Sequence, residues 1–166
     1  MKKTDLSDFD PTAVPNGKGY KIGIIAAEWN PEVTNAMCQG AFDTLREHGV
    51  LKKDITVIRV PGTFELTTAA DLMLERTFVD AVICIGCVIQ GETRHFEFIC
   101  QAVSQGLTNV ALKHNKPVIF SVLTCDTMQQ ALDRAGGCHG NKGVEGAVTA
   151  LKMIHLDRSI VFKIPS

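Results

Sequence analysis

The sequence predicts an α/β domain in which a parallel sheet lies between two layers of helices. Short apolar segments rich in β-branched residues alternate with longer segments whose apolar residues recur at helical spacing. The short segments contain few polar residues, as is typical of strands that are buried on both faces. These observations predict a three-layer α/β/α sandwich built around a four-stranded parallel sheet.

Boundary signals place these segments along the chain. Asn30 and Pro31 stand where a helix N-cap and a first helical residue are expected. Asp126 and Gln129 have the spacing of a capping box, which predicts a short helix that ends before Gly136. The expected strands cover residues 20–27, 55–60, 81–89 and 117–123, and the expected helices cover residues 31–47, 64–76, 95–110, 127–135 and 142–156.

Composition limits the kinds of protein that this chain can be. Its 166 residues suit one domain, and a net charge of −1 without a basic run argues against a nucleic-acid partner. The polar start is not expected to be a signal peptide, and no apolar run is long enough for a membrane span. The six cysteines are scattered through apolar segments, so reduced thiols and a cytoplasmic location are expected. We expect residues 1–19 to form an N-terminal arm and residues 20–166 to form a single domain.

The segment from residue 81 to residue 100 combines a buried strand, a glycine turn and an amphipathic helix. Gln90 to Thr93 interrupt the apolar run and begin the turn. Backbone N–H groups and the positive end of the helix dipole meet at such a turn, which favours phosphate binding. His95 lies in the first turn of the helix, directly above this point.

The ligands of an open parallel sheet bind outside the carboxyl ends of its strands. In this chain an aromatic ring, a carboxylate, an anion-binding turn and a histidine follow those ends. Such a set predicts a pocket for a flat heterocycle together with a phosphate. The four groups of candidate residues are Trp29–Asn30, Pro61–Glu65, Gln90–His95 and Phe120–Thr124.

Each of these residues also has a purely structural interpretation. Trp29 could pack half-buried at the start of its helix, and Glu65 could stabilise a helix N-terminus. A single histidine is more often structural than catalytic, although a neutral His95 could exchange protons near pH 7. The convergence of these residues on one sheet edge favours the functional interpretation.

Two further motifs contain cysteine or histidine. Cys84 and Cys87 have CxxC spacing, but positions i and i+3 of a strand point to opposite faces, so neither a metal site nor a redox pair is predicted. The segment GGCHGNKG is expected to form a flexible turn with a solvated His139. Arg134 and Lys142 flank this turn, either as surface charges or as a pair that closes on a phosphate from a neighbouring subunit.

Four separated motifs resemble those of the 6,7-dimethyl-8-ribityllumazine synthase family. They are VPGTFEL at 60–66, GCVIQGETRHFEFIC at 86–100, PVIFSVLT at 117–124 and RAGGCHGNKGVE at 134–145. The resemblance implies a flavodoxin-like fold and the penultimate step of riboflavin biosynthesis. In that step 5-amino-6-(D-ribitylamino)uracil condenses with 3,4-dihydroxy-2-butanone 4-phosphate, with release of phosphate and water and without a metal or an organic cofactor.

The same resemblance implies roles for individual residues. Trp29 would stack on the pyrimidine, and His95, Arg134 and Lys142 would be the catalytic residues. Ser121 would line the substrate pocket, at a position where the resemblance leads us to expect glycine. The other implied contacts are Asn30, Thr63, Phe64, Glu65, Val88 and Ile89 around the uracil substrate, Gly91, Glu92 and Thr93 around the phosphate, and Phe120, Arg134 and Lys142 from an adjacent subunit.

The family resemblance finally implies a homo-oligomer whose active sites lie between subunits. A pentamer is expected, and the short turn between Arg134 and Lys142 is compatible with a sixty-subunit icosahedral shell. Whether such a shell encloses riboflavin synthase is left open by the sequence. Three other functions stay open at this point. They are a non-catalytic protein that binds lumazine, riboflavin or a flavin nucleotide, an enzyme with riboflavin synthase activity, and a shell that serves mainly as a container.

Overall fold

The computed structural model describes residues 5 and 7–161 of the chain. Four parallel strands form its main sheet, in the spatial order β2-β1-β3-β4. Ile22 of β1 pairs with Ile55 of β2 on one side and with Ala81 of β3 on the other. The strands are β1 (Ile22–Ala27), β2 (Ile55–Val60), β3 (Ala81–Ile89) and β4 (Val118–Cys125). The predicted four-stranded parallel sheet is therefore confirmed.

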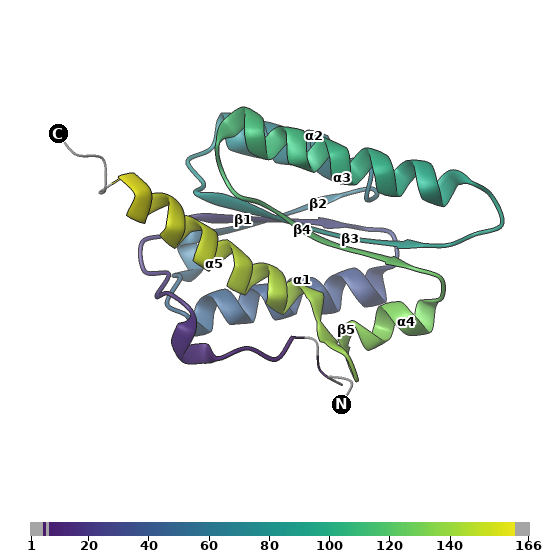
Figure 1. Ribbon diagram of the computed structural model, residues 1–166, viewed down its shortest axis with the longest axis horizontal. Coiled ribbons are helices and arrows are strands. Elements are labelled where there is room, and N and C mark those ends of the chain that lie inside the picture. The colour runs from purple at the N-terminus through teal and green to yellow at the C-terminus, as the bar shows by residue number, and fades with distance from the viewer. Residues whose placement is uncertain (1–4, 6, 162–166) are drawn as a thin grey trace.

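Helices cover both faces of this sheet, as Figure 1 shows. The helices α1 (Pro31–Glu47), α4 (Met128–Asp133) and α5 (Lys142–Val161) lie on one face, and α2 (Leu66–Arg76) and α3 (His95–His114) lie on the other. This arrangement confirms the predicted α/β/α sandwich and is consistent with a flavodoxin-like fold. Two short 3-10 helices, Pro11–Ala13 and Lys52–Asp54, precede β1 and β2. Within the described part of the chain, no helix combines the length and the apolar character needed to cross a bilayer.

The sheet separates two apolar clusters. Ile24 faces α1 and α5, whereas its neighbour Ile25 faces α2 and α3, and both are fully buried. Each such side chain contributes about 1.5–3 kcal/mol when it leaves water. Cys84 and Cys87 fall into opposite clusters, so the expected separation of the two thiols is confirmed.

The helix α4 begins one residue later than the capping-box prediction requires. Thr127 has the extended backbone of an N-cap, and its hydroxyl accepts a hydrogen bond from the N–H of Gln130 at 3.2 Å. The side chain of Gln130 in turn accepts from the N–H of Asp126 at 2.9 Å. The prediction of Asp126 with Gln129 was therefore wrong by one register, because the threonine hydroxyl supplies the cap.

A short antiparallel hairpin joins α4 to α5. It consists of β5 (Ala135–Gly137) and β6 (Gly140–Asn141), which the sequence analysis did not predict. Gly136 and Gly140 have φ angles of 112° and 83°, a conformation that side chains disfavour. These glycines therefore allow the backbone to form the tight β5–β6 hairpin between the two helices.

The described part of the N-terminal segment lies on the face that α1 and α5 cover. Val14 is buried in the core cluster of that face, and Phe9 packs against the same cluster. A side chain at Gly17 would come within 2.7 Å of both Val50 and Leu151. The division of the chain at residue 19 stays a prediction, but these contacts are made with the chain's own core.

Candidate functional site

A cavity of about 690 Å³ opens at the carboxyl ends of β1, β2 and β3. This is the sheet edge at which the sequence predicts a ligand. The predicted residues that line the cavity are Trp29, Asn30, Thr63, Phe64, Glu65, Val88, Ile89 and His95, and Gly62, Cys87 and Ile99 complete the lining.

The indole of Trp29 and the carboxylate of Glu65 both lie close to Gly62. A Cβ atom at Gly62 would come within 3.1 Å of Trp29 Cδ1 and 3.0 Å of Glu65 Oε2, so glycine permits this close approach. Trp29 is 72% exposed, which means that its ring is not packed into the core of this chain. Glu65 stands at the N-terminus of α2, but its side chain makes no capping hydrogen bond. Both groups are therefore presented to the cavity.

Asn30 links two strands of the cavity. It has a left-handed backbone with φ of 57°, and its side chain makes no hydrogen bond to the first turn of α1. Instead, its Nδ2 donates to the carbonyl oxygen of Cys87 at 3.0 Å. The predicted N-cap position is correct, but the side chain positions β1 against β3 and does not cap the helix.

His95 is the first residue of α3, and its exposed ring borders the cavity. Its backbone N–H donates to the hydroxyl of Thr93 at 3.4 Å. The residues Gly91, Glu92 and Thr93 are exposed beside the cavity and do not line it. Their backbone N–H groups have no hydrogen-bond partner among the described residues, so they remain available to an anion at the start of α3.

A second group of charged residues surrounds Glu145. One carboxylate oxygen of Glu145 lies 2.7 Å from Arg134 Nη2, and the other lies 2.9 Å from Lys142 Nζ. Burial opposes ionisation of Glu145, but the hydrogen bonds from Lys142 and Arg134 outweigh it and lower the pKa of the carboxyl. Arg134 also donates to the carbonyl oxygen of His139. Both predicted cations are thus held in place within the chain.

The remaining predicted residues lie in β4, away from the first cavity. Phe120 is 37% exposed, whereas Ser121 is fully buried. A smaller cavity of about 280 Å³ lies beside these two residues, Lys142 and Glu145. The hydroxyl of Ser121 has no hydrogen-bond partner within the described chain, and a Cβ atom at Gly146 of α5 would collide with it.

Cys87 is the cysteine among the residues that line the first cavity. Burial, with a smaller contribution from Cys125, raises the pKa of the Cys87 thiol to about 12. Cys87 is therefore protonated at neutral pH, which argues against a role as a nucleophile. Its contribution to the site is the backbone carbonyl that holds Asn30.

Sequence reasoning missed several residues of these two regions. Ile99 follows His95 by one helical turn, so the spacing alone could have placed it on the cavity. Glu145 follows Lys142 by three residues on a helix, which is a recognisable ion-pair spacing. No local pattern reveals the closeness of Gly62 to Trp29, because it depends on the pairing of β1 with β2.

Comparison with known proteins places these features in a family. Residues 19–158 match the family model described as 6,7-dimethyl-8-ribityllumazine synthase. Proteins of that name from Porphyromonas gingivalis, Cytophaga hutchinsonii and Bacteroides fragilis are similar to this chain. The first is 56% identical over 93% of this chain and 96% of its own length. The second is 58% identical over 85% and 89%, and the third is 49% identical over 81% and 94%, respectively.

Proposed function

We infer that this chain, which belongs to the 6,7-dimethyl-8-ribityllumazine synthase family, carries out the family's reaction in the cavity of Trp29 and His95. The enzyme condenses 5-amino-6-(D-ribitylamino)uracil with 3,4-dihydroxy-2-butanone 4-phosphate in the penultimate step of riboflavin biosynthesis. The products are 6,7-dimethyl-8-ribityllumazine, phosphate and water. The observation that carries the choice of site is the convergence of the Trp29 ring, the Glu65 carboxylate and the His95 imidazole on one cavity.

The uracil substrate binds against Trp29. An exposed indole can stack on a flat heterocycle, and such stacking contributes about 1–3 kcal/mol per ring. Asn30, Thr63 and Glu65 supply polar groups to the same cavity, and Val88 and Ile89 supply its apolar wall. This combination fits a ring with hydrogen-bonding edges and a polar ribityl chain.

His95 transfers protons between the reacting groups. Imine formation between the 5-amino group and the ketone, elimination of phosphate and ring closure all require proton transfers. The position of the exposed His95 ring at the edge of the cavity supports this role. Because the amine of the uracil is already a nucleophile, enforced proximity of the two substrates supplies much of the remaining acceleration.

The phosphate of the second substrate binds at the start of α3. The N–H groups of Gly91, Glu92 and Thr93, which have no partner among the residues that the structure describes, and the helix dipole both favour an anion there. A guanidinium group strengthens such a site, since it can donate two parallel hydrogen bonds to a phosphate. Arg134 is the candidate for this clamp, and Lys142 lies beside it on Glu145.

Arg134, Lys142 and Phe120 reach a substrate only in an assembly of several chains. None of the three lines the cavity of Trp29 and His95 in the described chain. We therefore place them in the active site of an adjacent subunit, so that each catalytic centre lies between two copies. This arrangement explains why the cations are held rigidly at a distance from their own cavity.

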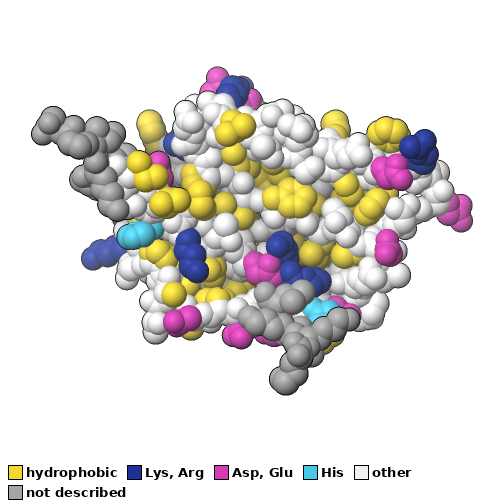
Figure 2. All heavy atoms as spheres, in the orientation of Figure 1, with side chains coloured by type: hydrophobic (Ala, Val, Ile, Leu, Met, Phe, Trp, Pro, Cys, Tyr) yellow, Lys and Arg dark blue, Asp and Glu magenta, His cyan; other side chains and the backbone are white. Residues whose placement is uncertain are grey.

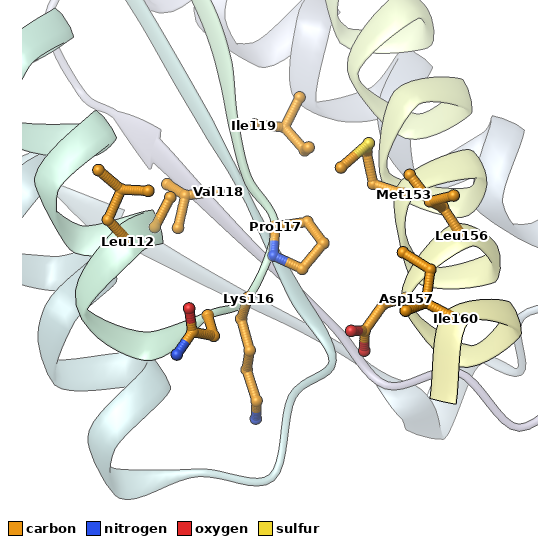
Figure 3. A pocket seen from close by; sticks show the side chains of 11 residues that line it. Leu112, Lys116, Pro117, Val118, Ile119, Met153, Leu156, Asp157 and Ile160 are labelled. Atoms are coloured by element: carbon orange, nitrogen blue, oxygen red, sulfur yellow. The ribbon is translucent and has the colours of Figure 1, made fainter. Parts of the chain in front are cut away.

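The surface of the chain offers a place for such a neighbour. Figure 2 shows hydrophobic side chains gathered across the middle of one face, over β4 and between α3 and α5. An apolar groove of about 430 Å³ lies there, and Figure 3 shows Leu112, Val118, Met153 and Ile160 around it. Leu112 is 71% exposed, which is unfavourable in water. A second copy of the chain, packed beside the edge strand β4, would bury these side chains.

We propose that the chain forms a pentamer in the cytoplasm and that this face makes the contact between subunits. Twelve such pentamers could assemble into a sixty-subunit shell around riboflavin synthase. Light scattering distinguishes these assemblies, because five chains of 18.0 kDa have a mass of about 90 kDa and sixty have about 1.1 MDa. A monomer in solution would contradict the shared active site. Replacement of Leu112 by Asp should dissociate the assembly, because it places a charge on the apolar face.

The test of the proposed reaction mixes the purified protein with both substrates and follows lumazine absorbance and phosphate release together. We expect equal rates of both, well above the uncatalysed background. The variant His95→Ala should lose about 100-fold in turnover, at the low end of general acid–base effects, and should still bind the uracil substrate. The variant His155→Ala removes an exposed histidine of α5 and is the matched control. Ligand binding without turnover in the unmodified protein would identify a binding protein instead.

A further inference from the structure

The turn of the β5–β6 hairpin brings two metal-ligating residue types to the end of α4. Gly137 pairs with Gly140 across the hairpin, so Cys138 and His139 form its two-residue turn. The backbone N–H of His139 donates to the carbonyl oxygen of Asp133 at 2.8 Å. The hairpin turn is thereby fastened over the last residue of α4.

The side chains of Asp133, Cys138 and His139 converge at this point. One carboxylate oxygen, the thiol sulfur and one imidazole nitrogen lie within 4.8 Å of one another. Ligand atoms around a tetrahedral zinc ion are about 3.3–3.8 Å apart, given metal–ligand distances of about 2.0–2.3 Å. Small side-chain rotations therefore close the cluster to coordination distance.

Two neighbours preorganise the cluster. Gln129 Nε2 donates to Asp133 Oδ1 at 2.9 Å and orients the carboxylate, as partners of metal ligands commonly do. Gly137 lets the hairpin approach α4, because a Cβ atom there would come within 2.7 Å of Asp133 Cα. A larger residue at this position would push the turn away from the carboxylate.

We propose that Asp133, Cys138 and His139 form a binding site for a thiophilic divalent cation of the zinc class. Thiolate and imidazole ligands favour Zn²⁺ and Co²⁺, whereas Mg²⁺ and Ca²⁺ prefer several oxygen ligands. Three protein ligands leave a fourth position for water or for a group from another molecule. The site is distinct from the Trp29 cavity and does not depend on the reaction proposed there.

A reactive thiol is the alternative interpretation of Cys138. The exposed thiol of Cys138 lies beside the Asp133 carboxylate, a neighbour that does not activate a cysteine as a nucleophile. A cation can displace the proton and bind both groups. The chemistry of the cluster therefore favours coordination over oxidation or covalent catalysis.

The proposed site shares its scaffold with Arg134. The carbonyl oxygen of His139 accepts a hydrogen bond from Arg134, and the N–H of Lys142 donates to the carbonyl oxygen of Arg134 at 2.9 Å. A bound cation would hold the turn between these two residues in one conformation. Metal occupancy is thereby linked to the segment that presents the candidate phosphate ligand.

The test titrates the metal-free full-length protein with Co²⁺ and then displaces Co²⁺ with Zn²⁺. We expect one cobalt per chain, a thiolate-to-cobalt charge-transfer band in the near ultraviolet and tetrahedral bands in the visible. The variants Cys138→Ser and His139→Ala should bind at least about 100-fold more weakly, since even loss of a supporting partner costs about 10–100-fold. The matched controls Cys100→Ser and His155→Ala should retain the spectrum.

Hydrogen exchange supplies an independent measurement. Zn²⁺ should slow amide exchange at residues 137–141 in the unmodified protein, and Cys138→Ser should abolish this protection while its far-ultraviolet circular dichroism stays unchanged. The absence of a charge-transfer band would overturn the proposal. Equal cobalt binding by Cys138→Ser and the unmodified protein would also overturn it, because the metal would then lie elsewhere.

Discussion

The cavity of Trp29 and the cluster around Glu145 hold their functional side chains in opposite ways. Within the described chain, the side chains of Trp29, Glu65 and His95 make no hydrogen bonds, and all three are exposed. Arg134 and Lys142 instead share one carboxylate, and their side chains are 17% and 31% exposed. The cavity is open to a ligand, whereas the two cations of the cluster are already paired with one carboxylate and keep one excess positive charge.

This difference shows how one chain can prepare two unlike parts of a binding site. Stacking and hydrogen bonding to a neutral ring need a shaped and accessible surface. A cation that must meet a phosphate needs a fixed direction, since oriented charges stabilise a developing anion without reorganisation. Glu145 supplies that direction, and the phosphate must then compete with Glu145 for Arg134.

The largest effect is expected from the loss of Arg134. The variant Arg134→Ala should reduce kcat/KM by about 30-fold or more, because loss of one partner of a desolvated charge pair, here the proposed pair of Arg134 with the substrate phosphate, costs about 2–5 kcal/mol. The loss should appear mainly in the KM of the phosphorylated substrate, measured by steady-state kinetics. Arg76→Ala, at the exposed end of α2, is the matched control. An unchanged KM would remove Arg134 from the phosphate site.

The removal of Trp29 tests the accessible cavity, in which the side chains of Trp29, Glu65 and His95 make no hydrogen bonds within the described chain. The variant Trp29→Ala should weaken binding of the uracil substrate by about 5–150-fold, from the ~1–3 kcal/mol of lost stacking. Thermal stability should change little, because the ring is 72% exposed. Calorimetric titration measures the affinity, and Phe78→Ala removes an aromatic ring that is 88% exposed as a control. A large fall in Tm would assign Trp29 a structural role.

Ser121 and Gly146 test the packing beneath the charged cluster. The variant Ser121→Ala should stabilise the protein by about 1 kcal/mol, because it removes a buried hydroxyl without a partner in the described chain. Gly146→Ala should destabilise it, since the added methyl group collides with the Ser121 hydroxyl. The double variant Ser121→Gly with Gly146→Ala should restore stability. Thermal unfolding that shows additive effects would contradict this contact.

The smallest effect is a difference in the pH dependence of stability. The folded-state pKa of Glu145 lies below its ordinary value of 4.5, so its stabilising contribution is complete above pH 4.5 and is lost as the pH falls through the lowered pKa. The variant Glu145→Gln should therefore be less stable than the unmodified protein at neutral pH. The difference between their free energies of unfolding should become smaller in acid. Urea unfolding at several pH values measures this difference. Glu65→Gln, which removes an exposed carboxylate, is the control for the loss of one negative charge.

Sequence signals predicted the bounds of an element correctly where breaking residues or a change in polarity mark its ends. The bounds of β2 and β3 agree with the prediction, because apolar runs are interrupted there by Pro61 and by the Gln90–Gly91 turn. The predicted start of α4 was one residue too early, because Asp126 and Thr127 are both residue types that can cap a helix and Thr127 is the one that does. The β5–β6 hairpin was missed because its strands have no apolar pattern and are shaped by glycines.

The candidate residues around the first cavity were predicted for a related reason. In a parallel sheet, every strand delivers its following loop to the same edge, so sequence order alone brings Trp29, Glu65 and His95 together. Their individual roles remain predictions. The same rule also gathered Phe120 and Ser121, which the structure places in β4 beside a different cavity.

The sequence by itself determined the alternation of strands and helices, the sheet edge that carries the site and the kind of groups found there. These properties follow from periodicity, from glycine and proline positions and from the geometry of parallel strands. Only the tertiary structure decided that Glu145 also holds Arg134, that Ser121 is enclosed against Gly146, and that Asp133 meets Cys138 and His139. Such contacts depend on how closely separate elements approach, and no local pattern in the chain records that distance.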